Sequence, residues 1–272
     1  MHKSVLLLVI SVLLCSYANG QSYKEAFRAA LDAKDMTKAE EILKAWDLAD
    51  ANDAELYVSY FNFFTVKSQE KDPQTYDKEN AGKALEFISE GISRFPTRLD
   101  MRIAKIYMLG ELEDYPAFTS EVIKMIEYSD KIKNNWKGED FRLVDKAEDM
   151  FFGAILDFQE QLFSKQDATL YKDVIKISEE TLKYYPKHTQ SRINLSTVYL
   201  TQKEYDKSLD VLLKAKEYEP RNAILLYNIA YMYSLKGDKD NAKKHFELVV
   251  GYATQEEEEL RLAAQKQIEA LK

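Results

Sequence analysis

The sequence predicts an all-α fold of stacked helical repeats, and three observations lead to this prediction. Pro186 and Pro220 lie 34 residues apart, and each follows a helical pattern of apolar residues. From Ala223 onward, apolar side chains recur at helical spacing, stop near Gly237, and recur in a second helical pattern. No stretch alternates for long with a period of two, so we expect no sheet. Helix pairs with broad apolar faces are stable when neighbouring copies cover those faces.

The two C-terminal copies define the repeat. At an offset of 34 residues, Asn194 aligns with Asn228 and Ser208 aligns with Ala242. The pattern closely resembles the tetratricopeptide repeat, in which two antiparallel helices carry small and aromatic residues at fixed positions. In the last copy these positions hold Ala230, Tyr233, Gly237, Ala242 and Phe246. In the copy before it they hold Leu195, Ser196, Tyr199, Tyr205, Ser208, Leu212 and Ala215.

Weaker copies extend the pattern upstream and predict a single tetratricopeptide-like helical repeat solenoid over residues 21–272. We expect repeats at 22–53, 54–98, 99–132, 141–188, 189–222 and 223–256. Their second helices should bury small and apolar stripes such as Ala39, Leu43 and Trp46, Ala81, Ala84, Ile88 and Gly91, Val122 and Met125, and Val174, Ser178 and Thr181. Long aromatic first helices at 54–69 and 147–163 precede polar inserts at Lys71–Asn80 and Ser164–Thr169.

The last segment, 257–272, is predicted to be a capping helix. Its apolar residues fall on one helical face, which would cover the open end of the final repeat. Glu257 and Arg261 are spaced to form an ion pair on the other face. The apolar residues of this face are Leu260, Ala264, Ile268 and Leu271.

The first twenty residues resemble a cleaved secretory signal. A short basic start precedes an apolar run from Val5 to Leu14, which is too short to span a bilayer, and small residues follow at 18–20. We therefore expect an exported chain that begins at Gln21, in a bacterial periplasm or secreted, although a eukaryotic secretory origin stays open. Cys15 is the only cysteine, and Leu14 before it disfavours cleavage as a lipoprotein.

Composition argues against several classes of function. The net charge is −8 and no basic run exists, so we expect neither nucleic-acid binding nor attachment to anionic lipid, and no stable membrane insertion. His188 and His245 fall in different repeats without carboxylates at ligand spacing, and we expect both on the surface. The sequence has no glycine-rich phosphate loop. We expect no catalytic residues, no metal site and no cofactor.

The resemblance implies where a partner would bind. In tetratricopeptide proteins, certain first-helix positions face the inside of the superhelix, where peptides bind. Tyrosine offers a broad contact area there, and asparagine can hydrogen-bond an extended backbone. Alternatively, these residues merely follow the repeat consensus and pack helices. The positions that match are Tyr107, Ile193, Asn194, Thr197, Tyr227, Asn228 and Tyr231.

The leading hypothesis is therefore a non-catalytic adaptor that binds a protein or peptide partner on a concave face. The inner positions carry no cationic set that would hold the carboxylate of a chaperone tail, since they are Asp100, Ile103, Ile193, Thr197 and Tyr231. Two alternatives remain. One is a structural subunit of an envelope assembly that uses the convex face and the inserts. The other is a carrier of a small ligand or glycan, with aromatic residues such as Tyr107 against the sugar rings.

Overall fold

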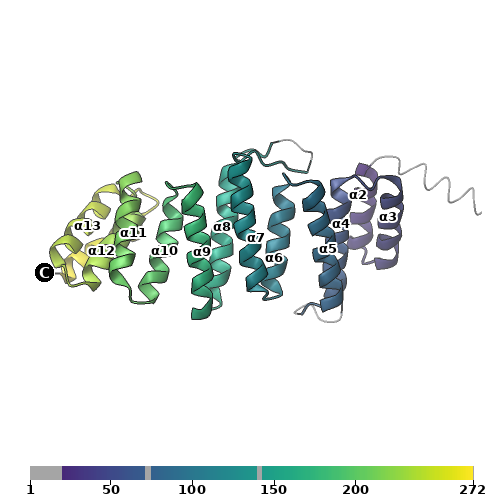
Figure 1. Ribbon diagram of the computed structural model, residues 1–272. Helices are drawn as coiled ribbons and strands as arrows, with labels where there is room; N and C mark the ends of the chain where they lie inside the picture. Colours follow the sequence, from purple (N-terminus) through teal and green to yellow (C-terminus); the bar gives the residue numbers. More distant parts are fainter. Residues whose placement is uncertain (1–19, 71–74, 140–142, 272) are drawn as a thin grey trace, which may run out of the picture. The chain divides into compact units, whose positions relative to one another are not determined.

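The computed structural model describes residues 20–70, 75–139 and 143–271 (Figure 1). Of the predicted signal segment, only Gly20 belongs to the described residues, and Cys15 lies outside them. Residues 71–74, which begin the predicted insert at 71–80, also lie outside the described residues. Within the described ranges, no helix is long and apolar enough to cross a membrane.

The fold is all-α, as predicted. In the described residues the chain forms thirteen α-helices, labelled α2 to α14, and one short 3-10 helix, η1. Strands are absent from this part of the chain, where only isolated bridges join Lys137 to Arg98 and to Leu143. The chain divides into two compact units, and each is described by itself. Unit 1 holds the residues up to Asp114 and also Ile132–Glu148, and unit 2 holds Tyr115–Lys131 and the chain from Asp149 onward. The boundaries expected for the six repeats stay predictions.

Unit 1 contains five helices and the stretch Ile132–Glu148, which we call the returning segment because the chain comes back to this unit there. The helices are α2 (Gly20–Asp32), α3 (Met36–Ala49), α4 (Ala54–Ser68), α5 (Lys78–Arg94) and α6 (Leu99–Glu111). Aspartates cap α3, α4 and α5 by accepting hydrogen bonds from backbone amides in the first turn. The predicted stripes of α3 and α5 are buried, with Ala39, Leu43, Trp46, Ala81, Ala84 and Ile88 in two core clusters. The returning segment buries Trp136 completely and bonds through the Lys137 amide to the Thr97 carbonyl.

Unit 1 also holds a buried cluster of charges. Arg98, which precedes α6, is fully buried, and its guanidinium lies 2.7 Å from both Glu55 and Asp100. Lys24 from α2 contacts the same Glu55 and also Glu139 of the returning segment. These carboxylates raise the pKa of Arg98 against the opposing effect of its burial, which is the largest influence on it. The cluster joins α2, α4, α6 and the returning segment because the buried cations Arg98 and Lys24 need acidic partners.

Unit 2 contains eight α-helices. They are α7 (Tyr115–Lys131), α8 (Ala147–Ser164), α9 (Tyr171–Tyr184), α10 (Thr189–Thr201), α11 (Tyr205–Tyr218), α12 (Ala223–Leu235), α13 (Lys239–Tyr252) and α14 (Glu258–Ala270), with η1 (Ala168–Leu170) before α9. Neighbouring helices pack in chain order from α9 to α14, and α7 packs against α9 (Figure 1). The predicted stripes of these helices are buried. They include Val122, Met125, Val174, Ser178, Thr181, Ser208, Leu212, Ala215, Ala242, Phe246 and Val249.

The buried polar groups of unit 2 are largely neutral. The amide of Gln159 on α8 donates to the Ser178 hydroxyl on α9 at 2.7 Å, and it accepts from the Asn194 amide on α10 at 2.6 Å. Ser196 and Ser208 form a second buried pair, 2.9 Å apart, between α10 and α11. Small hydroxyl and amide groups thus join α8, α9, α10 and α11 by hydrogen-bonding to one another.

Helix α14 is the predicted cap. It packs on α13 and α12, and Ala264 is fully buried in the terminal core cluster, against which Leu260, Ile268 and Leu271 also pack. The predicted pair of Glu257 and Arg261 is wrong in detail. Arg261 contacts Glu258 instead, because Glu257 lies just before the helix and accepts a hydrogen bond from the Thr254 amide.

Candidate partner-binding surface

The predicted partner-binding residues of unit 2 lie on α10 and α12, which begin the two C-terminal repeats. Thr197 and Tyr231 occupy equivalent positions, 34 residues apart, and both are exposed. Tyr231 leaves 40% of its surface in solvent. We call the exposed side of α8, α10 and α12 the first-helix face. It is the place where side chains from equivalent repeat positions reach solvent.

Not every predicted residue reaches that face. Ile193 is only 8% exposed and packs in a core cluster with Leu225 and Ile229, so its side chain contributes to stability rather than to a binding surface. Asn228 is half-buried. Tyr107 belongs to unit 1, where it lies on α6 with 37% of its surface exposed.

Asn194 is held by hydrogen bonds to other side chains and also lines a groove. Its amide donates to Gln159 and its carbonyl oxygen accepts from Gln190 at 3.1 Å, so the side chain is held in one orientation. Asn194 and Thr197 line a groove of about 350 Å³ between α8 and α10. The other lining residues are Leu156, Glu160, Phe163 and Gln190.

The groove has an acidic and amide lining. Among the described residues, Glu160 is the one charged residue that lines it, and neither lysine nor arginine does. Gln190 and Asn194 present amide groups that can hydrogen-bond a peptide backbone, and Phe163 and Leu156 provide apolar contact. The lining suits a neutral or basic segment better than an acidic one.

Tyr227 has a packing role that limits its use as a probe. Its ring lies edge-on to the ring of Phe246 on α13, with centroids 5.3 Å apart, and it contacts the terminal core cluster. Removing Tyr227 would therefore weaken packing as well as any contact with a partner. Tyr231, one turn later, contributes less to the core and is the cleaner probe.

The two histidines do not lie where we expected. His245 is only 5% exposed, and its Nδ1 donates to the Asn241 carbonyl while its Nε2 accepts from Lys216 at 2.8 Å. Burial lowers its pKa, and the nearby lysines add to the effect. The prediction of a surface position failed because Lys244 beside it in sequence faces outward while His245 faces the α11 helix.

His188 is half-buried and caps α10. Its Nδ1 accepts a hydrogen bond from the Ser191 amide at 3.3 Å, and its ring stacks on Phe152 with centroids 4.0 Å apart. Burial lowers the pKa of His188 to about 4, so the ring is neutral at neutral pH and its nitrogen can accept. Both histidines therefore serve packing. Within the described ranges, no three His, Cys, Asp or Glu side chains converge as metal ligands.

An all-α stack of helix pairs with an exposed first-helix face defines a class of helical-repeat binding proteins. The sequence model of the tetratricopeptide repeat matches residues 189–222 and 223–255. The chain therefore contains tetratricopeptide repeats at 189–222 and 223–255, and such repeats typically form non-catalytic scaffolds for interaction. No curated protein matches the chain in sequence.

Several solved structures are similar in outline. A tetratricopeptide repeat protein from Parabacteroides merdae is 18% identical, with a TM-score of 0.38, over 93% of this chain and 94% of the other. The pilF protein of Pseudomonas aeruginosa is 10% identical, with a TM-score of 0.41, over 91% and 96%. MamA from Desulfovibrio magneticus RS-1 is 16% identical, with a TM-score of 0.40, over 71% and 94%. At these values the likeness says nothing of function.

Proposed function

We propose that this chain is an exported adaptor that binds a segment of another protein on the first-helix face of unit 2. The tetratricopeptide repeats support a role in protein–protein interaction. One observation carries the proposal: Thr197 and Tyr231 reach solvent from equivalent positions on α10 and α12, and Thr197 borders the groove between α8 and α10. Partially exposed tyrosines and amide groups are the kinds of side chain that contact a bound peptide segment.

The binding experiment compares two tyrosines of equal exposure. Tyr231 and Tyr252 each leave 40% of their surface in solvent, but Tyr252 lies at the end of α13, the second helix of its repeat. Proteins crosslinked to the chain in its native compartment are captured with wild type, Tyr231→Ala and Tyr252→Ala. We expect Tyr231→Ala to lose the partner and Tyr252→Ala to retain it. If both variants retain the partner equally well, the proposal that it binds on the first-helix face is wrong.

Export rests on the N-terminal pattern and needs its own test. The chain is expressed with residues 1–20 in a Gram-negative host, and the cytoplasmic and periplasmic fractions are compared. We expect the periplasmic form to begin at Gln21, after cleavage behind the small residues at 18–20. A full-length chain that stays in the cytoplasm would overturn the proposed location while leaving the binding proposal to its own experiment.

A further inference from the structure

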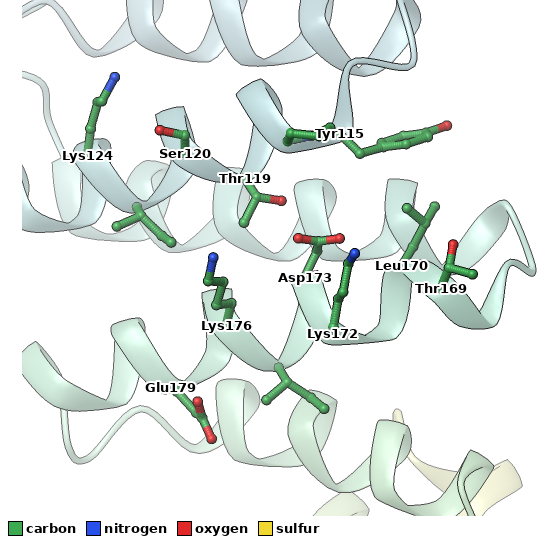
Figure 2. A pocket seen from close by; sticks show the side chains of 13 residues that line it. Tyr115, Thr119, Ser120, Lys124, Thr169, Leu170, Lys172, Asp173, Lys176 and Glu179 are labelled. Carbon is green, nitrogen blue, oxygen red and sulfur yellow. The ribbon is translucent and has the colours of Figure 1, made fainter.

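A second groove lies in unit 2, on helices that the proposed function does not use. It has a volume of about 780 Å³ and runs between α7 on one side and η1 with α9 on the other (Figure 2). The polar insert at Ser164–Thr169 ends in this groove, because Thr169 belongs to its lining. We call it the α7–α9 groove. It contains one buried hydroxyl that has no hydrogen-bond partner among the described residues.

Two buried polar groups face each other across this groove. Thr119 on α7 is 3% exposed, and its hydroxyl has no hydrogen-bond partner within the described residues. Asp173 on α9 is 8% exposed, and its carboxylate forms no hydrogen bond or ion pair recorded in this part of the chain. Figure 2 shows both side chains directed into the space between the helices. Burying a hydroxyl without a partner costs free energy, and an occupant that hydrogen-bonds to it would recover that cost.

Two lysines stand at the edge of the same groove. Lys172 and Lys176 extend from α9 toward α7 (Figure 2), both are exposed, and neither forms an ion pair in the region that the structure describes. A third lysine, Lys124, is held by Glu121 at 2.7 Å. Lys172 and Lys176 are therefore the cations that an incoming anion would meet first, in a chain whose overall charge is −8.

The geometry points to one occupant: we propose that the α7–α9 groove binds an extended acidic segment of another protein. Its backbone N–H groups donate to the Asp173 carboxylate, and a backbone carbonyl accepts from the Thr119 hydroxyl. Its acidic side chains pair with Lys172 and Lys176. Residues four apart on a helix have Cβ atoms about 5–6 Å apart. Alternate side chains of an extended chain are about 6–7 Å apart, so acidic residues at every second position fit the two lysines.

The buried carboxylate argues against a polyanionic sugar in the same place. A sulfated glycan offers negative groups that Lys172 and Lys176 would attract, but Asp173 and Glu179 would repel. A peptide offers both acidic side chains and N–H donors, and so it satisfies both parts of the lining. This site is independent of the first-helix face, and its test uses a separate probe.

The probe is a fluorescein-labelled peptide of alternating aspartate and glycine, and its binding is followed by fluorescence polarisation. Two further peptides test the chemistry: one has lysine in place of aspartate, and one has the aspartates gathered at one end. We expect the alternating acidic peptide to bind most tightly. The double variant Lys172→Glu/Lys176→Glu should weaken its binding by about tenfold or more. Lys214→Glu/Lys239→Glu makes the same charge change on α11 and α13, outside the groove, and should leave affinity unchanged.

A second variant separates binding from folding. Thr119→Val keeps the side-chain shape and removes the unpartnered hydroxyl. We expect an equal or higher melting temperature, because no bond is lost in the free protein, and about threefold weaker peptide binding. Thr181→Val is the matched control, since the buried Thr181 hydroxyl already donates to the Ile177 carbonyl at 2.8 Å. It should lower the melting temperature and leave peptide affinity unchanged.

Three results would overturn the proposal. The first is an alternating acidic peptide that fails to bind wild type. The second is an affinity that does not change in Lys172→Glu/Lys176→Glu. The third is a heparin fragment that displaces the peptide while Thr119→Val leaves peptide affinity unchanged, since the groove would then attract any polyanion by charge alone.

Discussion

The two units of this chain stabilise their interiors with different chemistry. In unit 1, Arg98 is fully buried between Glu55 and Asp100, and Lys24 completes the cluster. In unit 2, the amides of Gln159 and Asn194 and several hydroxyls join α8, α9, α10 and α11. The repeats at 189–255, which the family model matches, lie in unit 2. Neutral amides and hydroxyls thus join the helices from α8 to α11, whereas a charged centre joins the helices and the returning segment of unit 1.

The two units can be followed by different signals. The chain has two tryptophans, Trp46 and Trp136, and both lie fully buried in unit 1. Intrinsic tryptophan fluorescence therefore reports unfolding of unit 1, while far-UV circular dichroism reports the helices of both units. Comparing the two signals during urea unfolding assigns the effect of each substitution to a unit.

The largest effect is expected from the charged centre of unit 1. Arg98→Met leaves Glu55 buried with fewer cationic partners, and we expect it to lower the free energy of unfolding by about 3–5 kcal/mol. The fluorescence midpoint in urea should fall accordingly. Adding Glu55→Gln should recover part of the loss, because the uncompensated charge is then removed. An unchanged fluorescence midpoint in Arg98→Met would show that the cluster contributes nothing to unit 1.

A close contact between α4 and α5 comes next. A Cβ at Gly91 would lie 2.8 Å from the Cβ of Tyr57 and 3.2 Å from the sulfur of Met101. Gly91→Ala should therefore destabilise unit 1 by about 1–3 kcal/mol, because Tyr57 cannot move its Cβ without moving α4. Gly82→Ala on the same helix is the control. Its new methyl meets nothing within 4 Å, and it should raise stability by up to about 1 kcal/mol. Equal behaviour of both variants would contradict the close contact.

The neutral network of unit 2 should have a smaller effect. Gln159→Leu leaves Ser178 without its donor and Asn194 without its acceptor, and we expect a loss of about 1–2 kcal/mol. The urea concentration at the midpoint of unfolding should fall when it is followed by circular dichroism. It should stay unchanged when it is followed by tryptophan fluorescence. A fluorescence midpoint that falls equally far would contradict the assignment of this network to unit 2 alone.

The smallest effect concerns pH. Since burial lowers the pKa of His188 from 6.5 to about 4, the unfolded chain binds a proton more readily than the folded one between these values. The contribution of His188 to stability is therefore complete above pH 6.5 and is lost as the pH falls through about 4. His188→Asn keeps a capping acceptor that does not titrate, so its melting temperature should fall less on acidification. The pH dependence of the melting temperature that remains in this variant should include a contribution from His245, whose pKa is also lowered by burial. Identical slopes for wild type and variant would exclude His188 from the pH response.

Much of the fold follows from local pattern. The spacing of Ala242, Phe246 and Val249 predicts which side of α13 is buried, because a helix places such residues on one face. The long helices at 54–69 and 147–163 were predicted within one residue of α4 and α8. The cap α14 was predicted from Leu260 and Ala264 for the same reason.

Other features depend on contacts between distant residues and could not be predicted from spacing. Arg98 resembles a surface arginine in sequence, and its burial depends on Glu55 of α4, which meets it together with the neighbouring Asp100. His245 needed Lys216 as its partner from the preceding second helix. The α7–α9 groove brings Thr119 near Asp173, which lies far along the chain, and no periodic pattern relates the two.

The order of the units along the chain restricts how the protein can be divided. The backbone passes from unit 1 to unit 2 at Asp114, back at Ile132, and again to unit 2 at Asp149. A single cut therefore releases neither unit whole. A fragment that starts at Asp149 lacks α7 and with it one wall of the α7–α9 groove, and a fragment that stops at Asp114 lacks Trp136. During synthesis, unit 1 is completed only after α7 of the other unit has already left the ribosome.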